Sequence, residues 1–262
     1  MAAVQSISPW LYPIAAVVIA NRALALSLLC HESIHGNLHK NRALNDWLGR
    51  YLCGFPTLMS LSRYRRLHLL HHSAVGSAKW DPDRNLYDFY PTKMRQFLLK
   101  QISSVVSLKT LKDFLSYYTD WPELLTKNRR LHVSSDVKQF TLFHLLVGIG
   151  TWTIGLQIEY LIFWIAPIVL ITQPYVLLMG GLQHGPARTN QPNASRTILG
   201  SKLYMWLLLP CDINFHAEHH LRPNIPHYHL KRFSESLLRS NVVLWKCSYR
   251  QAIKDLFQQS LA

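Results

Sequence analysis

Residues 214–229 read NFHAEHHLRPNIPHYH and hold five histidines within sixteen positions. Three of them, His216, His219 and His220, form an H-x-x-H-H cluster. Side chains three and four positions apart lie on the same face of a helix, so these rings can reach toward a common ligand. Histidine is also the commonest metal ligand in proteins. The stretch therefore predicts a short helix whose imidazoles bind a metal together with ligands from elsewhere in the chain.

Two more histidine clusters and one separate histidine lie upstream. HESIH starts at residue 31, HLLHH starts at residue 68, and GGLQH ends at residue 184. One such cluster alone is compatible with an ordinary polar surface, but several clusters that converge indicate a metal site. The predicted ligands are His31, His35, His68, His71, His72, His184, His216, His219 and His220.

The composition of this set narrows the choice of metal. Imidazole suits zinc, iron and copper, whereas closed structural zinc sites usually include cysteine. The four cysteines are widely scattered and form no C-x-x-C pair, which argues against a disulfide framework and favours a reducing compartment. Nine imidazoles exceed the need of one ion and match two ions. Five nearby carboxylates are predicted to orient the rings, namely Glu32, Asp81, Asp83, Asp212 and Glu218.

Long apolar segments between the clusters predict membrane helices. Apolar residues make up 49% of the chain but are unevenly distributed. The clearest apolar block, residues 140–182, is long enough for two helices at about 20 residues per span. We predict a hairpin of residues 140–156 and 160–182, with a tight turn at 157–159.

Three further segments are predicted at or in the membrane. Residues 10–30 form a span, in which Asn21 and Arg22 face other helices or water. This stretch lacks the basic start and the small-residue cleavage site of a signal peptide. Residues 47–61 form a stretch that is short for a membrane span, and we predict a re-entrant or interfacial segment there. Residues 94–118 are predicted to form an amphipathic helix on the membrane surface.

The charge distribution predicts which side of the membrane carries the histidines. The formal net charge is +14, with fourteen Lys and Arg in residues 63–138 and ten in residues 188–254. The turn between the two hairpin helices carries only Glu159. Cytoplasmic loops are rich in Lys and Arg, so both basic segments and the histidine clusters belong at the cytoplasmic face. Basic residues that flank spans without aromatic platforms or a known motif argue against nucleic-acid binding.

These observations predict an all-α fold, an integral membrane helical bundle with a cytoplasmic cap that carries a di-metal site. The chain shows no Gly/Ser linker and no internal repeat, so residues 1–262 are predicted to form a single domain. His39, His132, His227 and His229 lie in polar segments and are predicted to be solvated, and His144 is expected to contact a neighbouring helix.

The three ordered clusters resemble the histidine boxes of the membrane fatty acid desaturase superfamily. The resemblance extends to WDPD at 80–83 and RTI at 196–198, and covers about residues 22–235. It implies a non-haem di-iron centre at the cytosolic face, with His184 as the additional ligand and Asn214 contributing through a bound water. Members usually have another span before the first box, whereas about thirty residues precede His31 here, so the hairpin is incomplete or the chain starts late.

The resemblance implies an oxygen-dependent desaturase that introduces a double bond into a fatty acyl chain. Removing hydrogen from an unactivated alkyl chain requires a metal cofactor as oxidant. The sequence has no Rossmann glycine pattern, iron–sulfur cysteine cluster or haem motif. The electrons are therefore expected from a separate donor, a ferredoxin or a b-type cytochrome, which the basic face would attract.

Two alternatives remain open at this stage. A hydroxylase or ketolase of the same superfamily, acting on acyl chains or carotenoids, would use the same boxes, although RTI and the ending HLRPNIPHY favour acyl desaturation. A metal transporter or sensor is a different class, but transporters place their ligands near the bilayer midplane at broken helices. The clusters here lie in or beside segments that the charges assign to the cytoplasm.

Overall fold

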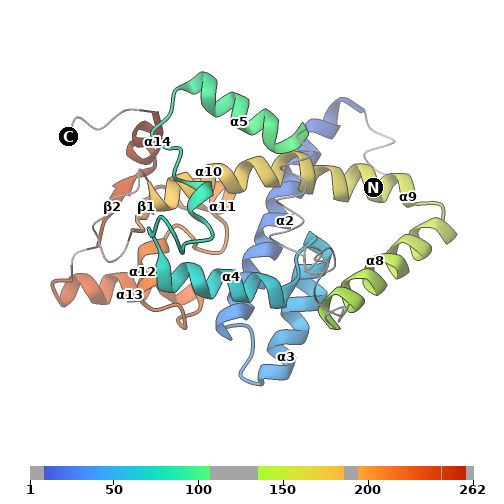
Figure 1. Ribbon diagram of the computed structural model, residues 1–262, viewed down its shortest axis with the longest axis horizontal. Coiled ribbons are helices and arrows are strands. Elements are labelled where there is room, and N and C mark those ends of the chain that lie inside the picture. Colours follow the sequence, from blue (N-terminus) through green and yellow to red (C-terminus); the bar gives the residue numbers. More distant parts are fainter. Residues whose placement is uncertain (1–8, 107–134, 186–193, 243, 258–262) are drawn as a thin grey trace.

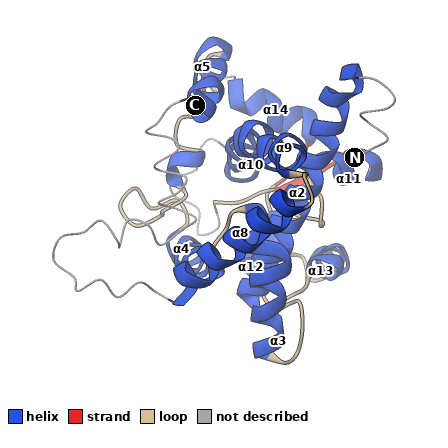
Figure 2. Ribbon diagram, turned by 90° about the vertical axis from the view of Figure 1, so that its right-hand side faces the viewer, coloured by secondary structure: helices blue, strands red, loops and turns tan. Residues whose placement is uncertain are grey.

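The computed structural model describes residues 9–106, 135–185, 194–242 and 244–257, and this part of the chain is mostly helical (Figures 1 and 2). The first half comprises η1 (Pro9–Leu11), α2 (Tyr12–His35), α3 (Arg42–Trp47), η2 (Leu48–Gly54), η3 (Phe55–Thr57), α4 (Leu61–Ala74), η4 (Arg84–Leu86) and α5 (Met94–Val106). The second half comprises α8 (Ser135–Thr153), α9 (Gln157–Tyr160), η5 (Leu161–Ile165), η6 (Ile168–Thr172), α10 (Gln173–His184), β1 (Thr197–Leu199), α11 (Lys202–Leu208), α12 (His216–Leu221), α13 (His227–Arg239), β2 (Lys246–Ser248) and α14 (Tyr249–Phe257).

Two helices in the described residues are long and apolar enough to cross a membrane. They are Tyr12–His35 and the continuous helix Gln157–His184, which includes α9, η5, η6 and α10. They correspond to the predicted spans 10–30 and 160–182. The other predicted member of the hairpin, α8, has 19 residues but is not one of these two candidate spans among the described residues.

The turn of the hairpin lies slightly earlier than predicted. The helix ends at Thr153 and the next begins at Gln157, so residues 154–156 connect them instead of 157–159. Gly155 adopts a left-handed conformation with φ of +71°, which glycine tolerates without steric cost. The backbone requirement of the turn, and not the polarity of Gln157 and Glu159, therefore decides where the chain reverses.

Glycine also ends α2 directly after the first histidine box. Gly36 has φ of +83°, and its N–H donates to the carbonyl of Ser33 at 3.2 Å. The next N–H, of Asn37, donates to the carbonyl of Glu32 at 3.0 Å. This is a common way for a helix to stop at a left-handed glycine. It leaves the first box on the last turn of α2.

The segment 47–61, predicted to be re-entrant or interfacial, is helical up to Thr57 and packs closely on α2. A Cβ atom at Gly49 would lie 2.0 Å from the hydroxyl oxygen of Ser33, and one at Gly54 would lie 3.1 Å from the sulfur of Cys30. Only glycine allows this approach of two backbones. The predicted surface helix 94–118 is observed as α5 up to Val106, and its remainder lies outside the described residues.

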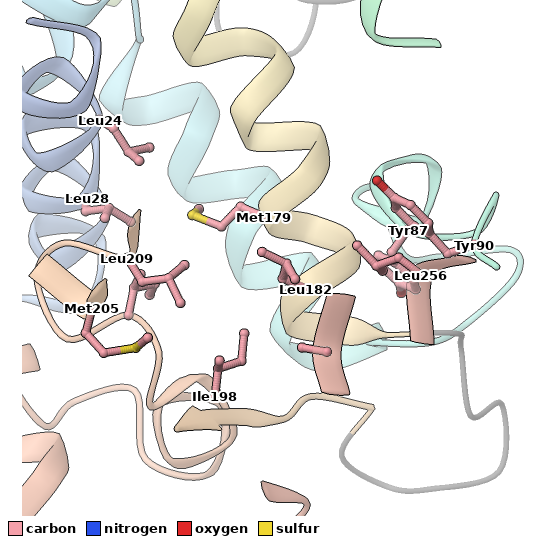
Figure 3. Packing of buried hydrophobic residues seen from close by; sticks show 12 residues of the cluster. Leu24, Leu28, Tyr87, Tyr90, Met179, Leu182, Ile198, Met205, Leu209 and Leu256 are labelled. Atoms are coloured by element: carbon pink, nitrogen blue, oxygen red, sulfur yellow. The ribbon is translucent and has the colours of Figure 1, made fainter. Parts of the chain in front are cut away.

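A hydrophobic cluster joins α2 and α10, two of the helices that carry the histidines (Figure 3). Leu24 and Leu28 of α2 meet Met179 and Leu182 of α10, and Leu256 of α14 packs against the same cluster. Beside it, β1 and β2 pair in parallel, with Thr197 opposite Lys246. Elements from both ends of the chain thus hold α2, α10 and the third box in fixed positions.

Candidate metal centre

The structure brings all nine predicted ligands together at the ends of four helices. They form two groups, and within each group the ligand nitrogens all lie within 4.8 Å of one another. The five-histidine group contains His31, His35, His68, His72 and His219, and the four-histidine group contains His71, His184, His216 and His220. The clusters that are far apart in the sequence therefore converge.

Each H-x-x-H-H cluster contributes to both groups. In α4, His68 and His72 belong to the five-histidine group, whereas His71 belongs to the four-histidine group. The relation is reversed in α12, where the i and i+4 residues His216 and His220 join the four-histidine group and His219 joins the other. At 3.6 residues per turn, residue i+4 projects about 40° to one side of residue i and residue i+3 about 60° to the other side, so the i+3 ring is directed away from the i and i+4 rings. One helix turn can therefore supply two adjacent ions.

The distances between ring nitrogens fit metal coordination. The Nε2 atom of His68 lies 3.1 Å from that of His35 and 2.8 Å from that of His72. In the other group the Nε2 atom of His216 lies 3.1 Å from those of both His184 and His220. Two nitrogens at right angles around a metal, each bound at about 2.1 Å, are separated by about 3.0 Å. The donor set thus fits imidazole-binding metals such as iron, copper and zinc.

Burial keeps several of the predicted ligand rings in the neutral form that binds metals. Burial, reinforced by neighbouring imidazoles, lowers the pKa of His68, His216, His219 and His220 well below the ordinary value. Burial also lowers the pKa of His72, to about 3. A metal ligand must be a neutral imidazole, so these rings lose no binding energy to deprotonation at neutral pH.

His71 is oriented by the aspartate of the WDPD segment. Its Nδ1 atom lies 2.8 Å from an oxygen of Asp81, and Asp81 also accepts hydrogen bonds from the hydroxyl of Tyr87 and, at 3.0 Å, from the N–H of Gly76. Burial pushes the pKa of His71 down, but the hydrogen bond to Asp81 and the charges of Asp83 and Asp81 outweigh it and raise that pKa. With Nδ1–H donated to Asp81, the other nitrogen points to the four-histidine group.

His184 is held by groups that the sequence did not reveal. Its Nδ1 atom lies 3.0 Å from the carbonyl oxygen of Ala194, and the ring of Tyr87 stacks on it at 4.8 Å. The backbone N–H of Arg196 donates to the carbonyl of Gln183 at 2.8 Å. The RTI segment thus acts as a strand that fixes the end of α10.

The other predicted carboxylates differ in how they meet the site. Glu32 lies 3.8 Å from His31 and accepts a hydrogen bond from the N–H of His227, and Asp83 lies 3.8 Å from His71. Glu218 is fully buried and lies between His216 and His219 in α12, where it accepts a hydrogen bond from the hydroxyl of Thr197 and pairs with Lys246 at 3.5 Å. It therefore positions α12 as a whole and does not orient one ring.

Asp212 and Asn214 lie on the approach to α12. Asp212 has φ of +47°. Within the described residues it forms no hydrogen bond or ion pair with the nine rings. Asn214 donates to the carbonyl of Ile198 at 3.0 Å and so ties this approach to β1. A contribution of Asn214 through a bound water remains a prediction.

The remaining histidines within the described residues lie outside both groups. His39 and His229 are exposed, in line with the prediction. His227 is half-buried, because its backbone packs on Glu32, so the prediction of a solvated ring is wrong for this residue. His144 contacts the rings of Phe140 and Phe143 within α8, and His132 lies outside the described residues.

Apolar cavities adjoin the histidines. A cavity of about 80 Å³ is lined by His31, His68 and His184 together with Leu28 and Met179. A second cavity of about 70 Å³ shares Leu28 and Met179 with the first and extends to Leu24. A third of about 160 Å³ also contacts Leu24. The three cavities lie along the seam between α2 and α10, and the first of them reaches the imidazoles.

Comparison with known proteins agrees with this arrangement. The fatty acid desaturase family model matches residues 8–245, so the chain belongs to the fatty acid desaturase family. It is similar to dihydrorhizobitoxine desaturase from Bradyrhizobium elkanii, with 28% identity over 86% of this chain and 67% of that protein. It is also similar to the sn-1 acyl-lipid omega-3 desaturase (ferredoxin) from Synechocystis, at 25% identity over 86% and 67%. A beta-carotene ketolase from Paracoccus is 24% identical over 80% of this chain and 74% of its own length.

Replacing Asp81 by asparagine should weaken metal binding at the four-histidine group. A neutral amide replaces the charged carboxylate that accepts the hydrogen bond from Nδ1–H of His71. Loss of such a partner typically costs about 10–100-fold in metal affinity. Metal titration of the purified apoprotein measures this change. Asp88→Asn is the matched control, because Asp88 is exposed and pairs with Arg84 at 2.9 Å. Equal affinities in the two variants would contradict the assigned role of Asp81.

Proposed function

We propose that this chain is an oxygen-dependent desaturase that introduces a double bond into a fatty acyl chain, with two iron ions held by the nine histidines. The observation that carries this proposal is the pair of buried imidazole groups beside an apolar cavity. The donors are all imidazole nitrogens, which suit iron. Bound iron would supply, with dioxygen and electrons, the oxidant that removes hydrogen from an unactivated alkyl carbon.

The residues of this chain hold the substrate and the ligands in place. Leu24, Leu28 and Met179 line the cavities and exclude water from an alkyl chain that lies between α2 and α10. Asp81 accepts a hydrogen bond from Nδ1–H of His71, and the carbonyl of Ala194 accepts one from Nδ1–H of His184, so the proton stays on Nδ1 of each ring. Desaturation removes two hydrogen atoms from the acyl chain. Together with one dioxygen, two electrons and two protons, these hydrogen atoms form two water molecules.

We further propose that the whole chain, residues 1–262, forms one membrane-embedded domain with the histidines at the cytoplasmic face. The two apolar helices and the basic segments beside the boxes support this orientation. The electrons would come from a separate donor, either a ferredoxin or a b-type cytochrome. The name of the Synechocystis relative includes ferredoxin, and the basic surface would attract an acidic carrier.

Product analysis tests the desaturase proposal against its closest alternative. The similarity to a beta-carotene ketolase favours, as the second candidate, a hydroxylase or ketolase acting on acyl chains or carotenoids. The chain is expressed in a host that contains a ferredoxin and its reductase, and the lipids are analysed by mass spectrometry. We expect acyl chains that are lighter by two hydrogen atoms. Products that instead gain an oxygen atom would overturn desaturation in favour of the second candidate.

The metal content of the same preparation provides an independent test. Two tightly bound irons per chain are expected, since the nine ligands form two groups. An unaltered acyl profile from protein that is fully loaded with iron would contradict the proposed activity. Labile zinc in place of iron would favour the transporter or sensor alternative.

A further inference from the structure

Three polar side chains from the two apolar helices meet the end of α11. Asn21 donates through its amide to the carbonyl of Leu207, and the guanidinium of Arg22 lies 3.5 Å from the carbonyl oxygen of Trp206. The hydroxyl of Tyr175 donates to the carbonyl of Leu208. The last three carbonyls of this short helix thus each receive a side-chain donor.

Such donors are needed where water is absent. The final carbonyls of a helix have no partner within the helix, and at an aqueous surface water satisfies them. In hydrocarbon each unsatisfied backbone group is costly, so partners must come from the protein. The donors here come from α2 and from the long helix that contains α10, the two helices with the length and hydropathy of a span. The arrangement suits a helix end that lies at membrane depth.

The same contacts account for the two polar residues in the middle of α2. An arginine within an apolar span is tolerated when it pairs with backbone carbonyls or faces the protein interior. Arg22 meets the carbonyl of Trp206, and its guanidinium lies 4.4 Å from the centre of that residue's indole ring. Counted along α2 at 1.5 Å per residue, Arg22 is about 20 Å from His35. The end of α11 is therefore level with the apolar part of α2 and well away from its last turn.

The outer face of α11 is apolar and exposed. Leu203 is 65% exposed, Trp206 56% and Leu207 46%, whereas Met205 on the opposite face is buried in the hydrophobic cluster. This face is continuous with exposed apolar residues of α2, since Val17, Leu207 and Leu208 line one cavity. Figure 2 shows α11 beside α2. The apolar surface of the spans thus extends onto α11.

We propose that α11 is inserted into the bilayer leaflet on the histidine side, with Leu203, Trp206 and Leu207 among the lipid acyl chains. The proposal rests on the membrane placement of α2 and α10 that forms part of the proposed function. His216 follows Leu208 by eight residues. The insertion therefore holds the third histidine box against the membrane surface, close to the cavity through which an acyl chain would reach the metals.

Depth-dependent fluorescence quenching tests the insertion. Cysteine replaces one exposed leucine at a time in a chain with Cys211→Ser and Cys247→Ser, and carries a bimane label in phosphatidylcholine nanodiscs. Leu203 is the test position, Leu170 in the candidate span is the lipid reference at 52% exposure, and Leu238 in α13 is the aqueous reference at 58%. The quencher is phosphatidylcholine with a nitroxide on its acyl chain. We expect the labels at 203 and 170 to lose about half of their emission and the label at 238 less than about a tenth.

The three positions separate the possible failures. A label at 203 that behaves like that at 238, while the label at 170 is quenched, would overturn the insertion of α11 alone. A label at 170 that is not quenched would overturn the membrane placement of the span, and with it the proposal for α11. A label at 203 that neither the lipid quencher nor aqueous iodide reaches would assign this face to a protein contact and would also overturn the proposal.

Discussion

Alanine at His71 or at His219 should abolish turnover, and each change should act mainly on a different metal group. His71 belongs to the four-histidine group and His219 to the five-histidine group. Loss of a residue that only orients a ligand costs about 10–100-fold in affinity or activity, so loss of the ligand itself should exceed this range. We expect acyl-chain desaturation below detection and metal content reduced from two ions toward one per chain. Mass spectrometry of lipids and elemental analysis of the purified protein measure the two effects.

The control for these variants is His229→Ala. His229 is exposed on α13 and lies outside both groups, so its removal should leave turnover and metal content unchanged. Membrane insertion and solubilisation should be alike in all three variants, because no ligand belongs to the hydrophobic cluster. Wild-type turnover in either ligand variant would contradict the assignment of that residue, and equal losses in His229→Ala would show that the effect is not specific to the site.

The convergence of the nine predicted ligands could be anticipated because the relevant signal is local. Spacing within HESIH, HLLHH and HAEHH reports which rings share a helix face, and the charges beside the apolar segments indicate a common side. The division into two groups was not predicted. It depends on the direction from which α4 and α12 approach α2, so that His71 and His219 separate from their own neighbours. Helical spacing alone carries no information on that approach.

The groups that orient the ligands were predicted only where they are carboxylates near the boxes. Asp81 was found in this way and contacts His71. Tyr87 stacks on His184 and donates to Asp81, but nothing in a single sequence distinguishes it from the other eleven tyrosines. The carbonyl of Ala194 is a backbone group that any residue could supply. Such partners follow from the packing of β1 against α10, which is a property of the tertiary structure.

The buried guanidinium of Arg196 predicts the largest change in stability. It is fully buried, pairs with Asp255 at 2.7 Å, and donates to the carbonyls of Leu182 and Gly181, the second at 3.2 Å. Two of these acceptors lie in the last turn of α10, where a positive charge also stabilises the helix dipole. Arg196 therefore holds the turn that carries His184 against α14.

Arg196→Met should lower the free energy of unfolding by about 3 kcal/mol, because removing one partner of a buried pair costs about 3–5 kcal/mol and Asp255 remains partly solvated. Thermal unfolding in detergent measures the shift, and Arg250→Met is the control, since Arg250 is exposed on the same helix as Asp255. Loosening the last turn of α10 should also release metal from the four-histidine group before the five-histidine group. If Arg196→Met is as stable as Arg250→Met and retains both metals, the end of α10 does not depend on Arg196, and the link from the RTI segment to His184 is wrong.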